Sequence, residues 1–346
     1  MNVKAFLLAI LLPCQALAQG FAGLGATAGD FAQPSPDTRL QFPADHAAHP
    51  SFRIEWWYVT ANLTGPDGTA YGAQWTLFRT ALAPFQAQGF ASPQIWMGHA
   101  ALTTPTAHFV AERLGRGGIG QAGVTAAPFA AWIDDWALQG PDFDHLQMQA
   151  SGSDFGYDLQ LDAKGPLVLH GQNGYSVKSA AGQASQYYSQ PFFQVAGQIT
   201  LPEGRVAVTG TAWLDREWSS QPLAADQRGW DWFSLSFDSG DKLMGFVLRG
   251  ASDYTSATWI AADGTATALP DGAFSAQPLM RQRIAGRDLP TKWQLRLPDH
   301  GVDVTIDALN PNAWMTTSVP YWEGPITITG SHSGVGYLEM TGYDDK

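Results

Sequence analysis

The chain has 346 residues and a formal net charge of −12, with 19 basic against 31 acidic side chains. An acidic chain without runs of lysine or arginine is a poor binder of nucleic acid and of anionic membrane surfaces. Charged residues make up only 14%, whereas 14 tryptophans and 37 glycines are present. Few charges, many aromatic rings and frequent glycine turns are typical of a large all-β protein.

The first residues form a targeting segment. Lys4 precedes an apolar run that ends in a small-x-small triplet at residues 16–18. This layout predicts a signal peptide over residues 1–18, which is too short to span a membrane, and a protein that is secreted or periplasmic. The only cysteine, Cys14, follows Pro13 rather than a small residue, so no lipid anchor is predicted.

The rest of the chain shows strand patterns. Residues 19–38 are rich in glycine, proline and other small residues, and they predict a flexible leader. From residue 39 onward, short apolar runs alternate with turn signals such as GPDG and DSGD. No long stretch shows a helical period, so the folded part is predicted to be all-β.

The stretch FRIEWWYVTANLT, residues 52–64, begins the first predicted hairpin. With Glu55 opposite Arg79, the next directly opposed positions are all apolar or small, and such positions share a face. The glutamate and the arginine then meet at the end of a buried face. Trp57 belongs to this face, and Trp56 must point the other way.

The segment DWFSLSFDSGDKLMGFVLR, residues 231–249, repeats this design. Asp231 starts its first strand, and Arg249 ends its second strand and is placed directly opposite. Two hairpins of one design predict two related domains, residues 39–187 and 188–346.

The acids at these hairpin ends have two interpretations. The pairs Glu55–Arg79 and Asp231–Arg249 are predicted to be structural ion pairs. In the alternative, both acids are catalytic. The structural interpretation is preferred, because an arginine partner lowers the pKa of a carboxyl group and makes it a poor proton donor.

The segment VTGTAWLDREWSS, residues 208–220, contains the strongest candidate for catalysis. On a strand, Trp213, Asp215 and Glu217 share one face, and the two carboxylates stand about 7 Å apart. Mutual repulsion and burial can raise one pKa, as proton donation near neutral pH requires. In the alternative, the segment is an exposed edge and both acids are solvated.

Histidine offers weaker candidates. His99, in the apolar run WMGHAALTT, is a candidate base or ligand contact, although a single histidine there is more often a core residue. His46 and His49 lie near Asp45 and Glu55 in the sequence, but a zinc site needs three or four convergent ligands. No metal and no other cofactor is therefore predicted.

The C-terminal region contributes further aromatic and acidic residues. Tyr321, Trp322 and Glu323 begin one predicted strand, and Glu339 lies on the last strand. Aromatic rings with isolated polar groups are typical of a cavity for an apolar ligand. Whether the two glutamates belong to a core or to a pocket wall stays open at this point.

Several of these segments together resemble one known family. The chain is similar to the AttH-like secreted proteins with tandem lipocalin-like domains, a family that also includes carotenoid 1,2-hydratase (hydroxyneurosporene synthase). The resemblance implies two tandem lipocalin-like antiparallel β-barrel domains packed together, with a ligand cleft between or within them. It is carried by FPADHAAHPSFRIEWWYVT, QWTLFR, GTAWLDREWSS, GWDWFSLSFDSGDKLMGFVLR, YWEG and GVGYLEMTGY.

The hydratase branch of this family implies a chemistry. There, a cofactor-free enzyme adds water across a terminal alkene, and an aspartic acid protonates the alkene. The stretch that holds this acid aligns with residues 213–215, where Asp215 is kept but a tyrosine and a histidine are replaced. The AttH-like branch, which is closer to this sequence, is associated with export-type ABC transporters.

Three functional hypotheses result. In the first, the protein binds an apolar molecule such as a lipid or isoprenoid and exchanges it with an ABC transporter permease. In the second, it is a cofactor-independent hydratase or hydrolase with Asp215 as general acid, assisted by Glu217, His99 or Tyr321. A carbohydrate-binding or glycosidase-like protein ranks last. The residues predicted to bind the ligand are Trp57, Trp213, Trp218, Trp230, Trp232, Tyr321 and Trp322.

Overall fold

The structure is a computed structural model that describes residues 22, 24 and 29–343. The predicted signal peptide and about half of the predicted leader therefore lie outside the described residues. Residues 29–38 of the leader contain no helix and no strand. Within the described residues, no helix is long and apolar enough to cross a membrane.

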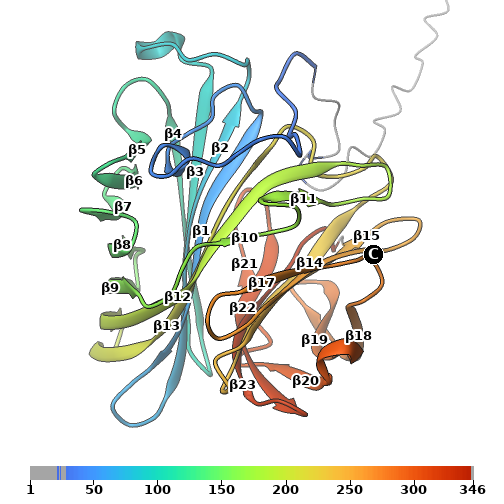
Figure 1. Cartoon of the computed structure of the whole chain (residues 1–346). Helices are drawn as coiled ribbons and strands as arrows, with labels where there is room; N and C mark the ends of the chain where they lie inside the picture. Colours follow the sequence, from blue (N-terminus) through green and yellow to red (C-terminus); the bar gives the residue numbers. More distant parts are fainter. Residues whose placement is uncertain (1–21, 23, 25–28, 344–346) are drawn as a thin grey trace, which may run out of the picture.

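Two antiparallel sheets make up the fold, and each curls into a barrel-like domain (Figure 1). The first sheet has 13 strands, in the spatial order β4-β3-β2-β1-β13-β12-β9-β8-β7-β6-β5, with β10 and β11 paired to β12. Its strands are β1 (Ile54–Thr64), β2 (Ala70–Ala81), β3 (Gln94–Thr103), β4 (His108–Arg116), β5 (Ala122–Ala126), β6 (Phe129–Ile133), β7 (Trp136–Gly140), β8 (His145–Ser151), β9 (Gly156–Ala163), β10 (Val168–Leu169), β11 (Tyr175–Val177), β12 (Ala184–Leu201) and β13 (Gly204–Ser219).

The second sheet has ten strands, in the order β17-β16-β15-β14-β23-β22-β20-β19-β18, with β21 paired to β22. Within residues 29–343, three short 3-10 helices accompany the sheets, namely η2 (Ala44–His46), η3 (Gly89–Ala91) and η4 (Pro298–His300). The strands are β14 (Gly229–Phe237), β15 (Lys242–Arg249), β16 (Tyr254–Ile260), β17 (Ala266–Leu269), β18 (Ser275–Ile284), β19 (Arg287–Leu297), β20 (Val302–Ala308), β21 (Trp314–Met315), β22 (Tyr321–Gly330) and β23 (Gly334–Met340).

The two sheets share one layout. In the first, β1 pairs with the next strand, β2, and with the last strand, β13. In the second, β14 pairs in the same way with β15 and with β23. The chain passes from one sheet to the other between Ser219 and Gly229. The boundary predicted at residue 188 therefore falls inside β12, because the hairpin of β12 and β13 completes the first sheet.

The two predicted hairpins differ in how well their register was anticipated. In the first, Glu55 lies opposite Arg79, as predicted. In the second, Arg249 lies opposite Gly229, and Asp231 lies opposite Val247, so the predicted register is wrong by two residues. The connecting turn is the reason, because Gly240 adopts a φ of +95° and closes a tighter turn. A shift of two keeps every side chain on its predicted face.

Four apolar clusters follow from this arrangement within the described residues, and the smallest joins Ala101 of the first sheet to Met315 and Tyr321 of the second. Each sheet encloses a core of its own, and a third cluster lies between the two barrels. The third cluster joins Tyr58 and Trp213 of the first sheet to Trp232 and Phe246 of the second. Each barrel thus buries residues on both the inner and the outer side of the strands that face the other barrel.

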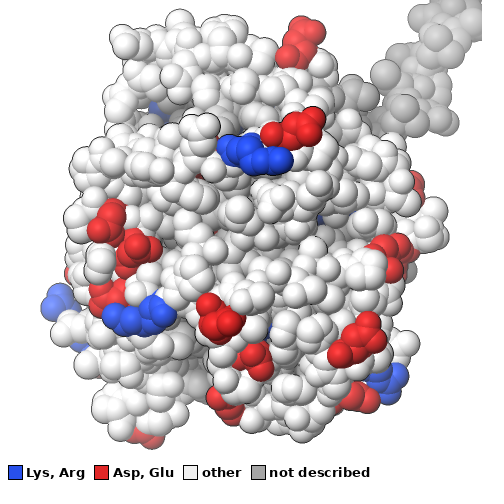
Figure 2. Space-filling view, in the orientation of Figure 1, with Lys and Arg blue, Asp and Glu red and all other residues white. Residues whose placement is uncertain are grey.

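Charged side chains are sparse on the face of the molecule that Figure 2 shows. Figure 2 shows acidic and basic residues scattered over a mostly uncharged face, without a basic patch. The lack of a basic patch on this face agrees with the acidic composition, because nucleic-acid binding requires a positively charged surface.

Candidate functional site

A cavity of about 290 Å³ lies between the two barrels. Its walls combine apolar rings, such as Trp56 and Trp232, with a few ionisable groups, among them Asp215. Ile95 and Leu114 also line it and are 43% and 60% exposed, so the cavity reaches the molecular surface there. Such a mostly apolar cleft with isolated polar groups is the usual form of a small-molecule site.

Asp215 lies on β13 and is buried. Tyr187 donates a hydrogen bond to its Oδ2 atom at 2.6 Å, and Trp213 donates one from Nε1 to its Oδ1 atom at 2.6 Å. Ser189, which is directly opposite in the sheet, donates a third. Arg216, the next residue, points to the other face of the strand. The carboxyl group of Asp215 is therefore fixed by neutral donors and is not paired with an arginine.

The environment of Asp215 favours its protonated form. Burial raises its pKa to about 7, although the hydrogen bonds from Ser189, Tyr187 and Trp213 act in the opposite direction. The negative charge of Glu217 adds to the increase. A carboxyl group with a pKa near neutrality can both donate and accept a proton.

A chain of hydrogen bonds extends from this acid into the second barrel. The hydroxyl of Ser189 is 2.6 Å from His170 Nε2, and His170 Nδ1 is 2.9 Å from the hydroxyl of Thr258. Burial and the charge of Lys178 lower the pKa of His170 well below its usual range. A neutral imidazole therefore connects Asp215 to β16 of the other sheet.

Glu217, two residues further along β13, lies on the same face and also lines the cavity. The Nζ atom of Lys178 is 3.2 Å from its Oε1 atom, and both side chains are buried. The same Nζ atom lies 4.5 Å from the ring centre of Tyr187 and 4.0 Å from that of Phe246. Burial lowers the pKa of Lys178, whereas the charge of Glu217 raises it.

Glu339 brings a third acid to the cavity, from β23 of the second barrel. Its Oε1 atom accepts a hydrogen bond from Trp230 Nε1 at 2.5 Å. Burial raises its pKa to about 8, and the charges of Asp215 and Glu217 contribute to this increase. The two barrels thus each supply acids to the same space.

His99 and Tyr321 meet on another part of the cavity wall. The Nδ1 atom of His99 is 3.0 Å from the hydroxyl of Tyr321, and its Nε2 atom is 3.1 Å from Glu112 Oε1. Burial lowers the pKa of His99, whereas hydrogen bonds from His99 and Ser318 hold the pKa of Glu112 at about 2. A neutral His99 then donates from Nε2 to the Glu112 carboxylate and accepts at Nδ1 from Tyr321.

The comparisons with known proteins agree with this architecture. The model of the AttH-like family matches residues 33–343. The chain belongs to the AttH-like family. No curated protein is detectably similar to it in sequence. A crystal structure of an AttH protein from Nitrosomonas europaea is 35% identical, with a TM-score of 0.83, and the match covers 90% of this chain and 99% of that chain.

Two more distant structures share the AttH-like fold. Kievitone hydratase from Nectria haematococca is 15% identical, with a TM-score of 0.66, over 91% of this chain and 98% of that chain. CghA, in complex with Sch210972, is 12% identical, with a TM-score of 0.55, over 92% of this chain and 97% of that chain. At this level of identity, the likeness concerns the fold alone.

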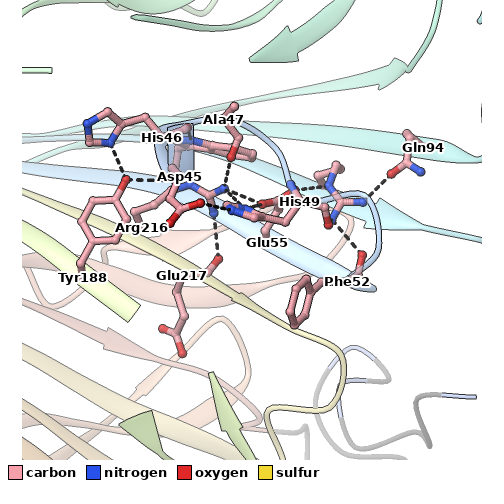
Figure 3. A network of polar contacts seen from close by, with 12 residues as sticks. Asp45, His46, Ala47, His49, Phe52, Glu55, Gln94, Tyr188, Arg216 and Glu217 are labelled. Atoms are coloured by element: carbon pink, nitrogen blue, oxygen red, sulfur yellow. Dashed lines mark hydrogen bonds and ion pairs between the residues drawn. The ribbon is translucent and has the colours of Figure 1, made fainter. Parts of the chain in front are cut away.

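Glu55 lies in a different environment from Asp215. It is buried and pairs with both Arg79 and Arg216. The backbone N–H of His49 donates to it at 2.8 Å, and Figure 3 shows Glu55 beside Arg216 and His49. Burial alone would raise its pKa, but the charges of the two arginines hold the pKa well below its usual range. The predicted ion pair is therefore present, and a second arginine joins it from β13.

The ion pair predicted in the second barrel is also present. Arg249 Nε is 3.2 Å from Asp231 Oδ2, although these residues are not directly opposed in the sheet. Tyr343 donates a hydrogen bond to the other carboxylate oxygen at 2.9 Å. Burial raises the pKa of Asp231 to about 6, because its single arginine is partly exposed and only partly offsets the burial.

The residues predicted to bind a ligand divide by the face of their strand. Trp230, Trp232 and Tyr321 line the cavity. Trp213 packs between the barrels and holds Asp215. The other three predicted residues point into the barrel cores instead, because they occupy the opposite strand parity: Trp57, Trp218 and Trp322.

His46 and His49, the two histidines weighed as metal ligands, contact protein groups. His46 Nδ1 is 2.7 Å from the hydroxyl of Tyr188, and its ring stacks on Phe143 with centres 3.8 Å apart. His49 lies between Asp45 and Glu55 at 3.2 Å from each. Among residues 29–343, no group of three or more His, Cys, Asp or Glu side chains is arranged to hold a metal ion.

Several residues of the site were not anticipated from the sequence. Lys178, Tyr187, Ser189 and His170 come from β12 and the connections before it, which carry no recognisable motif. Trp56 could have been found, because it must face away from the core residue Trp57. Its cavity position follows from that alternation.

Proposed function

We propose that this protein is exported and binds an apolar small molecule, lipid-like or isoprenoid-like, in the cavity between its two barrels. The observation that carries the proposal is the composition of the cavity walls. Aromatic and aliphatic side chains form most of the surface, and the polar groups are few and fixed by hydrogen bonds. Exchange of the ligand with an ABC transporter permease is part of the same proposal and rests on the family association.

Binding of all-trans-retinol tests this proposal, because retinol is an apolar isoprenoid whose uptake quenches nearby tryptophan fluorescence. Trp56→Ala removes a ring that lines the cavity, and it should weaken retinol binding about tenfold, as the loss of about 1.4 kcal/mol of apolar contact implies. Trp132→Ala is the matched control, since Trp132 bonds to Gly120 outside the cavity. Equal effects of the two changes, or no saturable binding by the native chain, would contradict the proposal.

A second candidate function is acid-catalysed addition of water to an alkene of the bound molecule. It is favoured by one observation, the buried carboxyl group of Asp215 with its raised pKa at the cavity wall. Asp215 would give its proton to one alkene carbon, and water would bond to the carbocation at the other. The proton that this water loses would pass through the hydroxyl of Tyr321 to His99 Nδ1.

The hydratase candidate is tested by turnover rather than by binding. A terminal-alkene isoprenoid is incubated with the protein in isotopically labelled water, and mass spectrometry detects the alcohol. Asp215→Asn should abolish formation of the alcohol while retinol binding survives, because an amide keeps the shape but cannot supply the proton. Unchanged turnover in this variant would exclude Asp215 as the acid.

A further inference from the structure

The polar end of the cavity has an unbalanced set of ionisable groups. Asp215 and Glu217 of β13, Glu339 of β23 and Lys178 all line it. There are thus three carboxyl groups to one ammonium group here, and the further acid of the cavity wall, Glu55, is already paired with Arg79 and Arg216. Any ligand that reaches this end must place its own polar head among them.

Lys178 shows how this end of the cavity accommodates an ammonium group. Its Nζ atom has the Glu217 carboxylate on one side, at 3.2 Å, and the rings of Tyr187 and Phe246 beside it. Opposite charge and aromatic faces together are the usual environment of a recognised cation. Lys178 neutralises Glu217 and leaves Asp215 and Glu339 without a cationic partner within the described residues.

Glu339 has a similar environment but no cation of its own. Within residues 29–343 it forms no ion pair, and its Oε1 atom accepts a hydrogen bond from Trp230 Nε1. Trp232 is directly opposite Glu339 in the sheet, and both indoles line the cavity. An aromatic wall and a carboxyl group without a cationic partner therefore lie side by side.

We infer that the cavity takes a hydrophobic molecule with an ammonium head, which lies near Glu339 and Asp215, and that it disfavours molecules with a carboxylate head, such as fatty acids. This inference rests on the proposed function, since it names the class of ligand for the same cavity. A cation would balance the excess of acids, whereas a carboxylate would add to it at close range in a desolvated space.

The protonation of these acids agrees with the inference. Burial and mutual repulsion raise the pKa of Asp215 to about 7 and that of Glu339 to about 8, so both resist ionisation while the cavity lacks a further cation. The other titratable groups near them are Glu217, Lys178, the neutral His170 and three tyrosines, namely Tyr58, Tyr187 and Tyr321. Glu323 lies directly opposite Glu339 in the sheet, and burial together with the charge of Glu339 raises its pKa well above the usual range, so it stays protonated. As the pH rises from about 6 to about 9, the two acids ionise and the affinity for an amine should increase, whereas the affinity for a carboxylate should fall.

Three retinoids with one hydrocarbon tail provide the test: retinylamine, retinol and retinoic acid. Their dissociation constants for the full chain are measured at neutral pH by quenching of tryptophan fluorescence. Retinylamine should bind at least about tenfold more tightly than retinoic acid, with retinol between them. Retinoic acid that binds as tightly as retinylamine, or more tightly, overturns the inference and leaves the proposed function intact. If none of the three binds, the proposed function fails and the inference fails with it.

A variant locates the head group. Glu339→Gln removes one acid and keeps its shape, so it should reduce the ratio of the dissociation constants of retinoic acid and retinylamine about tenfold. Glu203→Gln is the control, because Glu203 is exposed in the turn between β12 and β13. An unchanged ratio in Glu339→Gln, with retinol binding preserved, places the head group elsewhere and overturns the inference.

Discussion

Two buried carboxyl groups of this protein lie on neighbouring strands and differ in almost every property except burial. Glu55 of β1 faces the arginine side of β13 and is paired with Arg79 and Arg216. Asp215 of β13 faces the other barrel and is held by neutral donors. The first carboxyl group is held ionised, and the second has a pKa of about 7. Burial by itself therefore does not predict which carboxyl group can exchange a proton near neutral pH and which stays ionised as part of an ion pair. The difference comes from their partners, which are arginines for Glu55 and neutral donors for Asp215.

The largest expected effect concerns Glu55. Glu55→Ala leaves two buried arginines without compensation, so the free energy of unfolding should fall by about 3–5 kcal/mol. Chemical denaturation followed by tryptophan fluorescence measures it. Glu203→Ala, an exposed glutamate, serves as the control and should change stability little. A loss below about 1 kcal/mol would remove the contrast between the two acids.

A second prediction concerns Asp215 and the pH dependence of stability. Its pKa is higher in the folded than in the unfolded chain, so the folded protein binds more protons than the unfolded chain between about pH 4 and pH 7. The free energy of unfolding therefore falls as the pH rises through that range. Asp215→Asn should remove on the order of 4 kcal/mol of this fall. Denaturation curves at several pH values measure it, with Asp299→Asn at an exposed position as the control. Parallel pH profiles of native and Asp215→Asn protein would contradict the raised pKa.

The environment of Asp231 is intermediate between those of Glu55 and Asp215. It is buried like Glu55, but its single arginine is 23% exposed and its pKa is about 6. Asp231→Ala should therefore cost about 1–2 kcal/mol, less than Glu55→Ala. Denaturation at neutral pH ranks the two variants. A larger loss for Asp231 than for Glu55 would mean that the number of arginine partners does not determine the difference.

The sequence was sufficient for those parts of the structure that depend on local alternation. The register of the first hairpin, the two ion pairs and the shared face of Trp213, Asp215 and Glu217 all follow from residue parity and from the charged residues at the strand ends. The AttH-like family and the all-β fold were likewise recognisable from the sequence.

The parts that could not be predicted depend on distant pairing. Parity separates Trp56 from Trp57 but does not say which face is the inside of a barrel, so three core tryptophans were assigned to the ligand. Lys178 meets Glu217 only because β11 and β13 both pair with β12. Glu339 reaches Asp215 and Glu217 only through the packing of the two barrels, which no local pattern encodes.

Asp215 carries a proton near neutral pH, whereas Glu55 does not. Carbon-13 NMR of the side-chain carboxyl carbons measures this directly, with each signal assigned by its loss in Asp215→Asn or Glu55→Gln. We expect a titration midpoint of about 7 for Asp215, and a signal of Glu55 that shows an ionised carboxylate down to the pH at which acid unfolds the protein. A midpoint for Asp215 below about 5, within the ordinary range of an aspartate, would contradict the account.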